Sequence, residues 1–183
     1  MGARFARRRS DFLREIALVE DAVSGGAAPE PRVALVAEDS PDDRLLIEEA
    51  AEELREQDGI ALELVFVEDG EQALAFLNQE GVYAGDPRLK RMALAFFDIN
   101  MPRLSGVEAA REVRASAAWG WLPVVMFSTS RNTTDVMDSY RVGASAYVVK
   151  PMSAAIFIAT VRAVFRHWLS VTRDPEGRKE NGA

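Results

Sequence analysis

The stretch LAFFDINMPRLSG, residues 94–106, decides the fold. Four apolar residues from Leu94 to Phe97 run directly into Asp98, and Pro102 and Gly106 then break the chain. A continuous apolar run is typical of a strand that is covered on both faces. The stretch therefore predicts a buried strand whose carboxyl end carries a carboxylate.

The same order of strand and helix recurs on both sides of this stretch. Apolar runs predict strands at 32–39, 60–69, 92–98, 121–130 and 145–150. Helical patterns predict helices at 40–58, 70–81, 106–116, 133–144 and 153–172, with a loop at 82–91. Ser40 as N-cap and Pro41 in the first turn open the first of these helices, and Gly59 closes it. This alternation predicts an α/β fold with a parallel sheet covered by helices on both faces.

The composition excludes several classes of protein. The 183 residues include 29 acidic and 22 basic side chains, and the net charge of -7 disfavours non-specific binding to nucleic acid. There is no cysteine, and a single histidine, His167, rules out metal sites built from several histidines. No apolar run approaches the ~18 residues of a membrane span. We expect a soluble, cytoplasmic protein.

Polar residues end all five predicted strands, but Glu68 and Asp69 end the second, an outer strand whose tip lies away from the centre. Glu38 and Asp39 follow the first, Asp98 the third, Ser128 the fourth and Lys150 the fifth. Each is an ordinary residue on its own, but parallel strands bring their carboxyl ends to one edge, where ligands of such sheets bind. Clustered carboxylates repel one another, and Mg²⁺ relieves the repulsion. With a lysine and a hydroxyl nearby, the set predicts that Asp98 accepts a phosphoryl group.

Residues 32–169 resemble the receiver domain of response regulators, the phosphorylated components of two-component signalling. The matching residues are the acidic pair, the aspartate with its following proline and glycine, the hydroxyl residue and the lysine before a proline: Glu38, Asp39, Asp98, Pro102, Gly106, Ser128, Lys150 and Pro151. The resemblance implies a flavodoxin-like (βα)5 fold with the strand order 2-1-3-4-5.

The resemblance also implies roles for the residues of the site. Asp98 would receive the phosphoryl group from a sensor histidine kinase, with Lys150 stabilising its charge. Mg²⁺ would be held by Asp39 and Asp98, through water by Glu38, and by the backbone carbonyl of Asn100.

Three further expectations come from the same family. Ser128 completes the catalytic set with Asp98 and Lys150, and it forms with Tyr147 a switch that responds to phosphorylation. The Lys150–Pro151 peptide bond is expected to be cis. The protein is expected to be a phosphoacceptor and not an enzyme that turns over a substrate.

Several segments narrow the resemblance. SPDDRLLIEEA, VEDGEQALAFLNQEG, VYAGDPRLK and SYRVGASAYVVKP are similar to single-domain receivers that partner phytochrome-type kinases. The expected partners are a sensor histidine kinase, specifically a bacteriophytochrome, and a downstream protein of unknown identity, with no DNA and no membrane. Two alternatives stay open. A haloacid-dehalogenase-like phosphatase would need an acid where Asn100 stands, and an interaction module independent of phosphorylation would leave the complete residue set unused.

We divide the chain into an N-terminal helical arm and linker (1–31), the receiver domain (32–170) and a polar tail (171–183). The tail is too short for a DNA-binding fold, so we expect output through protein contacts. The arm has apolar residues at seven-residue spacing, and the last helix is apolar on more than one face, which favours a homodimer. The candidate dimer residues are Phe5, Phe12, Ile16, Phe157, Val161, Phe165 and Trp168.

Overall fold

The structure is a computed structural model that describes residues 30–170. The described residues from Pro31 onward belong to one compact unit, which contains the sheet. The expected N-terminal helical arm, with Phe5, Phe12 and Ile16, lies outside the described residues, as does the tail 171–183.

Five parallel strands form one sheet. They are β1 (Arg32–Ala37), β2 (Leu62–Val67), β3 (Met92–Phe97), β4 (Val124–Ser128) and β5 (Ala146–Val149). Their order is β2-β1-β3-β4-β5, as expected from the resemblance. The strands are shorter than the predicted runs, because those runs extended into the polar residues after each strand, such as Glu38 and Asp98.

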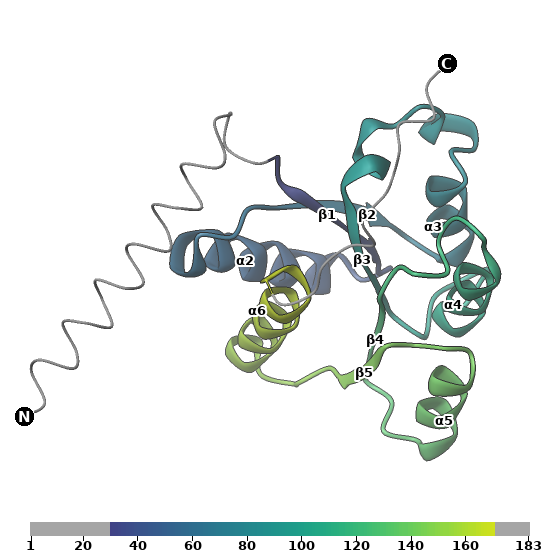
Figure 1. Cartoon of the computed structure of the whole chain (residues 1–183). Helices are drawn as coiled ribbons and strands as arrows, with labels where there is room; N and C mark the ends of the chain where they lie inside the picture. The colour runs from purple at the N-terminus through teal and green to yellow at the C-terminus, as the bar shows by residue number, and fades with distance from the viewer. Residues whose placement is uncertain (1–29, 171–183) are drawn as a thin grey trace, which may run out of the picture. The chain divides into compact units, whose positions relative to one another are not determined.

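Helices cover both faces of the sheet (Figure 1). On one side lie α2 (Pro41–Asp58) and α6 (Ala154–Ser170), and on the other lie α3 (Gly70–Leu77), α4 (Gly106–Ala115) and α5 (Thr133–Arg141). The predicted loop at 82–91 contains two 3-10 turns, Gly81–Tyr83 and Pro87–Arg91. None of the helices within the described residues is both long and apolar enough to cross a membrane.

The ends of α2 follow the sequence signals. The Ser40 side chain accepts a hydrogen bond from the Asp43 backbone N–H, and Pro41 occupies the first turn. Gly59 closes the helix in the left-handed conformation that glycine adopts without strain. These caps fix where α2 begins, directly after the carboxyl end of β1.

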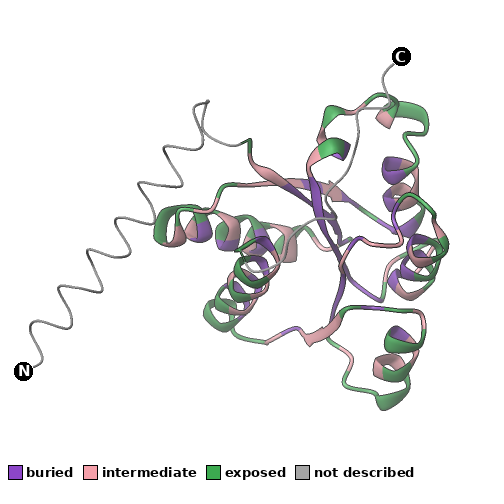
Figure 2. Cartoon of the chain, viewed as in Figure 1, coloured by how far each residue is buried: buried purple, intermediate pink, exposed green. Residues whose placement is uncertain are grey.

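Two apolar layers lie on opposite faces of the sheet (Figure 2). Every residue of β3 is buried, as expected for the central strand of a sheet covered on both sides. Its Phe96 contacts Phe127 of β4 and Phe165 of α6, with ring centroids 4.8 and 5.5 Å apart. The core therefore holds β3 rigidly up to the residue before Asp98.

The environment of α6 corrects part of the dimer expectation. Phe157, Val161 and Phe165 are buried in the core between α6 and the sheet, so their side chains are not available to a second protein chain. Trp168 is only partly buried, and Ile156 is exposed. The apolar face that looked like a dimer surface is used inside the domain, because α2 and α6 pack together over the same layer.

Candidate functional site

Backbone hydrogen bonds align the strand ends that carry the candidate residues. The N–H of Asp98 donates to the carbonyl of Ala37 at 2.9 Å, which places Asp98 beside the end of β1. The N–H of Lys150 donates to the carbonyl of Ser128 at 2.8 Å, so the ends of β4 and β5 are also neighbours. The predicted gathering of strand ends at one edge is what the structure contains.

The ammonium group of Lys150 lies at the centre of the site. Its Nζ donates to Glu38 Oε2 at 2.6 Å, to Asp43 Oδ2 at 2.8 Å and to Asp98 Oδ2 at 2.8 Å. Lys150 is 6% exposed and Asp98 is 9% exposed, whereas Glu38 is 2% exposed. The ion pairs of Lys150 with Glu38 and Asp98 are buried and therefore weakly screened, whereas Asp43 is more exposed.

Three carboxylates form a cluster that could hold a metal ion. Glu38, Asp39 and Asp98 each offer an oxygen, and these oxygens lie within 4.8 Å of one another. Asp39 is exposed, so the cluster is open to solvent on one side. Carboxylate oxygens at a site with room for water are the donors that Mg²⁺ prefers. The exposed Asn100 follows in the loop, and its N–H donates to Asp98 Oδ1 at 3.2 Å.

The charges of the site change two pKa values. Burial raises the pKa of Glu38 to about 7, and the charge of Asp98 adds to this, against the opposing effect of Lys150. Burial alone would lower the pKa of Lys150, but its hydrogen bonds to Asp43, Asp98 and Glu38 outweigh burial and raise it. Lys150 is therefore a permanent cation, whereas Glu38 exchanges a proton near neutral pH.

The loop after Asp98 is fixed at both ends. Ser105, where the family usually has an aspartate, is the N-cap of α4 and forms a reciprocal capping box with Glu108. Arg103 forms an ion pair with the buried Asp69 at the start of α3. These contacts hold the loop that carries Asn100 and Pro102 against the rest of the domain.

Ser128 and Tyr147, the residues of the expected switch, both contact Ser130. Ser128 is fully buried at the carboxyl end of β4, and its Oγ accepts a hydrogen bond from the N–H of Ser130 at 3.2 Å. The partly buried Tyr147 donates its hydroxyl to the carbonyl of Ser130 at 2.8 Å. Both side chains thus contact the same loop residue, which gives a direct route between them.

One expectation about the backbone is wrong. The Lys150–Pro151 peptide bond is trans, and no cis peptide bond occurs in residues 30–170. The two isomers of an X–Pro bond differ by only about 0.5–1 kcal/mol, so sequence alone does not fix the choice. With the trans bond, the Lys150 side chain still reaches Asp98.

Sequence reasoning missed two residues of the site. Asp43 bonds to Lys150, and Arg44 donates to the carbonyls of Glu38 and Val67 at 2.7 and 3.0 Å, which ties α2 to the ends of β1 and β2. Acidic residues in the first turn of a helix are usually explained by their favourable interaction with the helix dipole. Asp43 was therefore not recognised as a residue of the site. Its place one turn after the N-cap Ser40, directly above a strand end, was the available signal.

A parallel α/β sheet with an acidic cluster and a buried lysine at its carboxyl edge defines a class of phosphoryl-accepting signalling domains. Residues 34–162 match the response regulator receiver domain family. The chain belongs to this family.

Its relatives include a phytochrome response regulator. Response regulator Rcp1 of Synechocystis sp. is 32% identical over 145 residues, which cover 79% of this chain and 94% of that protein. The structure of the phosphorylated cyanobacterial phytochrome response regulator RcpA is 31% identical with a TM-score of 0.71, covering 78% of this chain and 97% of that one. The Mn²⁺-bound form of Rcp1 is 32% identical with a TM-score of 0.70, covering 79% and 99%.

Proposed function

We propose that Asp98 accepts a phosphoryl group from a sensor histidine kinase and that the chain signals this state through protein contacts. The observation that carries the proposal is the 2.8 Å contact between Lys150 Nζ and Asp98 Oδ2 inside a cluster of carboxylates. A lysine held against a strand-end aspartate provides a fixed positive charge where phosphoryl oxygens would arrive. The phosphatase alternative is disfavoured because Asn100 stands in place of a second acid.

The transfer is a displacement at phosphorus. A carboxylate oxygen of Asp98 attacks the phosphorus of a phosphohistidine, the new P–O bond forms as the P–N bond breaks, and the imidazole nitrogen keeps the electron pair and is protonated. Lys150 then donates to a phosphoryl oxygen. The Ser128 hydroxyl is a second donor to the phosphoryl group.

The donor set fits a divalent cation. Glu38, Asp39 and Asp98 would hold it, with the Asn100 carbonyl as the further ligand proposed from the family. Mg²⁺ bound there would neutralise charge on the oxygens of the transferred group. The Mn²⁺-bound form of Rcp1 supports a divalent site, and the all-oxygen donors favour Mg²⁺.

The switch follows from the contacts of Ser130. When Ser128 turns toward the phosphoryl group, its bond from the Ser130 N–H is lost, and the loop that holds the Tyr147 hydroxyl shifts. Tyr147 then turns inward and changes the surface formed by α5, β5 and α6. A charge change at Asp98 thus becomes a change of surface that a downstream protein reads.

The kinase partner is proposed to be a phytochrome-type kinase. The similarity to RcpA and Rcp1 over most of their lengths supports this. Exposed apolar side chains lie close in sequence to the residues of the site: Leu45 in α2, Met152 in the loop after Lys150, and Ile156 in the first turn of α6. They offer a contact surface to a protein that must bring a phosphohistidine to Asp98.

We further propose a homodimer and a role as an acceptor without turnover of a substrate. A shallow groove between β5 and α6 has small and apolar walls, among them Ala146, Ala159, Ala163 and Trp168. This groove, and not the buried face of α6, is the proposed contact. Asp98 would carry the phosphoryl group as a signal until hydrolysis resets it.

The deciding experiment is phosphotransfer from a labelled kinase. Asp98→Asn should abolish labelling, while Asp42→Asn, an exposed carboxylate of α2, should be labelled like the original chain. Continued labelling of the Asp98→Asn variant would disprove the assignment of Asp98. Steady release of phosphate from small phosphate esters would favour the phosphatase alternative instead.

A further inference from the structure

All three N–H donors of the Lys150 ammonium group are already used in hydrogen bonds. An ammonium has three N–H donors, and in this structure they face three carboxylates, those of Glu38, Asp43 and Asp98. A phosphoryl oxygen can bind Lys150 only if one of these hydrogen bonds is given up. The identity of that carboxylate determines how easily the phosphoryl group is accepted.

Asp43 differs from the other two carboxylates. Glu38 and Asp98 belong to the cluster that could hold a metal ion, whereas Asp43 does not. A cation in that cluster would compete with Lys150 for the oxygens of Glu38 and Asp98. Asp43 would then be the one carboxylate of the three that interacts with Lys150 alone. Asp43 is also anchored, because its backbone N–H donates to the N-cap Ser40 in the first turn of α2.

We propose that Asp43 is a positioning residue that competes with the phosphoryl group for Lys150 and so limits how tightly the domain holds that group. The inference rests on the proposed function of Asp98. Its physical basis is that a carboxylate 2.8 Å from the ammonium occupies a donor and offsets the positive charge that the phosphoryl oxygens need. Because the Asp43 side chain is 27% exposed, it can leave Lys150 and be solvated.

The test compares Asp43→Asn with Asp42→Asn. Both variants lose one charge in the first turn of α2, but only Asp43 contacts Lys150 in the structure. The probe is beryllofluoride with Mg²⁺, a mimic of the phosphoryl group, and the dissociation constant is measured by ¹⁹F NMR of the bound fluorides. We expect Asp43→Asn to bind about 5-fold more tightly than the original chain and Asp42→Asn to differ by less than about 2-fold.

A second comparison tests whether Asp43 acts through Lys150. In a Lys150→Met background, Asp43→Asn should no longer tighten binding, since the group for which Asp43 competes is gone. If tightening persists there, Asp43 repels the phosphoryl group directly and the positioning role is wrong. The role is also wrong if Asp43→Asn binds like Asp42→Asn or more weakly.

The outcomes separate this inference from the proposed function. If the original chain binds no beryllofluoride with Mg²⁺, or if Asp98→Asn binds it equally well, the proposed phosphoacceptor itself fails. If the original chain binds and Asp98→Asn does not, the acceptor stands and the comparison of Asp43 with Asp42 decides the inference alone. Circular dichroism of each variant confirms that the fold is kept.

Discussion

At the scale of single residues, Glu38 has a pKa that its surroundings shift into the neutral range. Its side chain lies beside Lys150 yet is 2% exposed, and burial raises its pKa from 4.5 to about 7. Between these two pH values the folded protein keeps a proton that the unfolded chain has released. Glu38 therefore adds stability that is fully present below pH 4.5 and is lost as the pH rises through about 7.

We predict that Glu38→Gln removes this dependence. In metal-free buffer, the original chain should lose stability relative to the variant between roughly pH 5 and pH 8, by roughly 1–3 kcal/mol. Urea unfolding of both proteins across this range measures the difference. A difference that stays constant with pH would show that Glu38 does not carry the buried proton.

At the scale of elements, the turn from β3 into α4 depends on Gly106. A Cβ added there would lie 2.0 Å from the carbonyl oxygen of Asp98, a distance that real Cβ atoms do not show. The atom that the added Cβ would clash with belongs to the backbone of Asp98, so it cannot move away by a change of rotamer as a flexible side chain could. The helix start and the phosphoacceptor position are therefore coupled through this glycine.

We predict that Gly106→Ala lowers the free energy of unfolding by about 2–4 kcal/mol and slows phosphotransfer to Asp98, because the loop must move away from it. The control is Gly85→Ala, where the added Cβ meets no atom within 4 Å and only the left-handed backbone is strained. That control should cost about 1–2 kcal/mol and leave phosphotransfer unchanged. Equal transfer rates for both variants would contradict the coupling.

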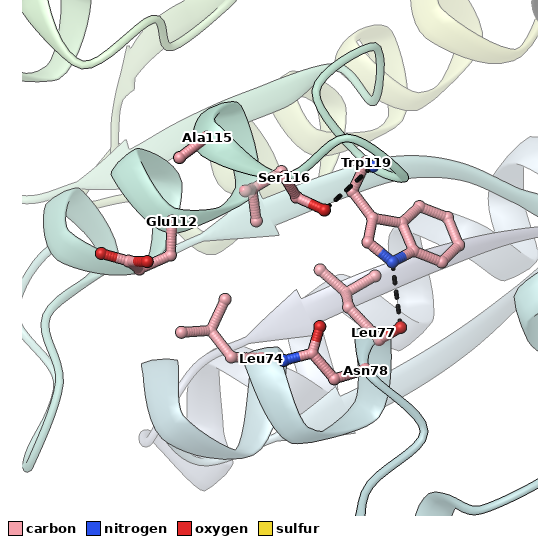
Figure 3. A pocket seen from close by; sticks show the side chains of 8 residues that line it. Leu74, Leu77, Asn78, Glu112, Ala115, Ser116 and Trp119 are labelled. Atoms are coloured by element: carbon pink, nitrogen blue, oxygen red, sulfur yellow. Dashed lines mark hydrogen bonds between the residues drawn. The ribbon is translucent and has the colours of Figure 1, made fainter.

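The contact between α3 and the segment after α4 depends on Trp119. Its indole Nε1–H donates to the carbonyl of Leu77 at 2.9 Å, at the end of a small pocket of about 240 Å³ between the two elements (Figure 3). The backbone N–H of Trp119 is held by Ser116 Oγ. This residue closes the apolar layer on that side of the sheet.

We predict that Trp119→Phe destabilises the domain by about 1–3 kcal/mol, from the lost hydrogen bond and the larger void. Trp121→Phe is the matched control, because the Nε1–H of Trp121 bonds to the carbonyl of Ala118 three residues earlier, not to a distant element, and its side chain is less buried. It should cost less than about 1 kcal/mol. Thermal unfolding of both variants gives the comparison, which a larger effect of Trp121→Phe would contradict.

These elements also show what sequence can predict. The strand order and the contact of Asp98 with Lys150 were predictable. Apolar runs, helix caps and strand-end residues are local signals of the elements, and the family resemblance supplied the order in which the strands pair. The contact of Asp43 with Lys150 was harder to predict: the place of Asp43 after Ser40 was a signal, but the contact also depends on how α2 is rotated over the sheet. The division of α6 into buried and exposed faces was missed for a similar reason: packing against α2, not periodicity, decides it.

At the scale of the whole molecule, the proposed phosphoacceptor and the proposed switch residue lie on different strands of the sheet. Asp98 follows the central strand β3, whereas Tyr147 lies on β5 at one edge of the sheet. The groove between β5 and α6 adjoins the same strand as Tyr147, so a partner seated there would sense the proposed switch. If the proposed dimer forms through this groove, self-association and phosphorylation would be linked, because a dimer that prefers one position of Tyr147 would also favour the corresponding state of Asp98.

We predict that Ala163→Glu, which adds a charge to the wall of this groove, weakens self-association at least about 10-fold because an ionised carboxylate resists burial. The same substitution at Ala61, an exposed residue before β2 at the opposite edge of the sheet, is the control. Sedimentation velocity over a concentration series, with and without beryllofluoride, measures the dimer. If Ala163→Glu associates like Ala61→Glu, the contact lies elsewhere. If the original chain stays monomeric under both conditions, the proposed homodimer is wrong, while the chemistry assigned to Asp98 is unaffected.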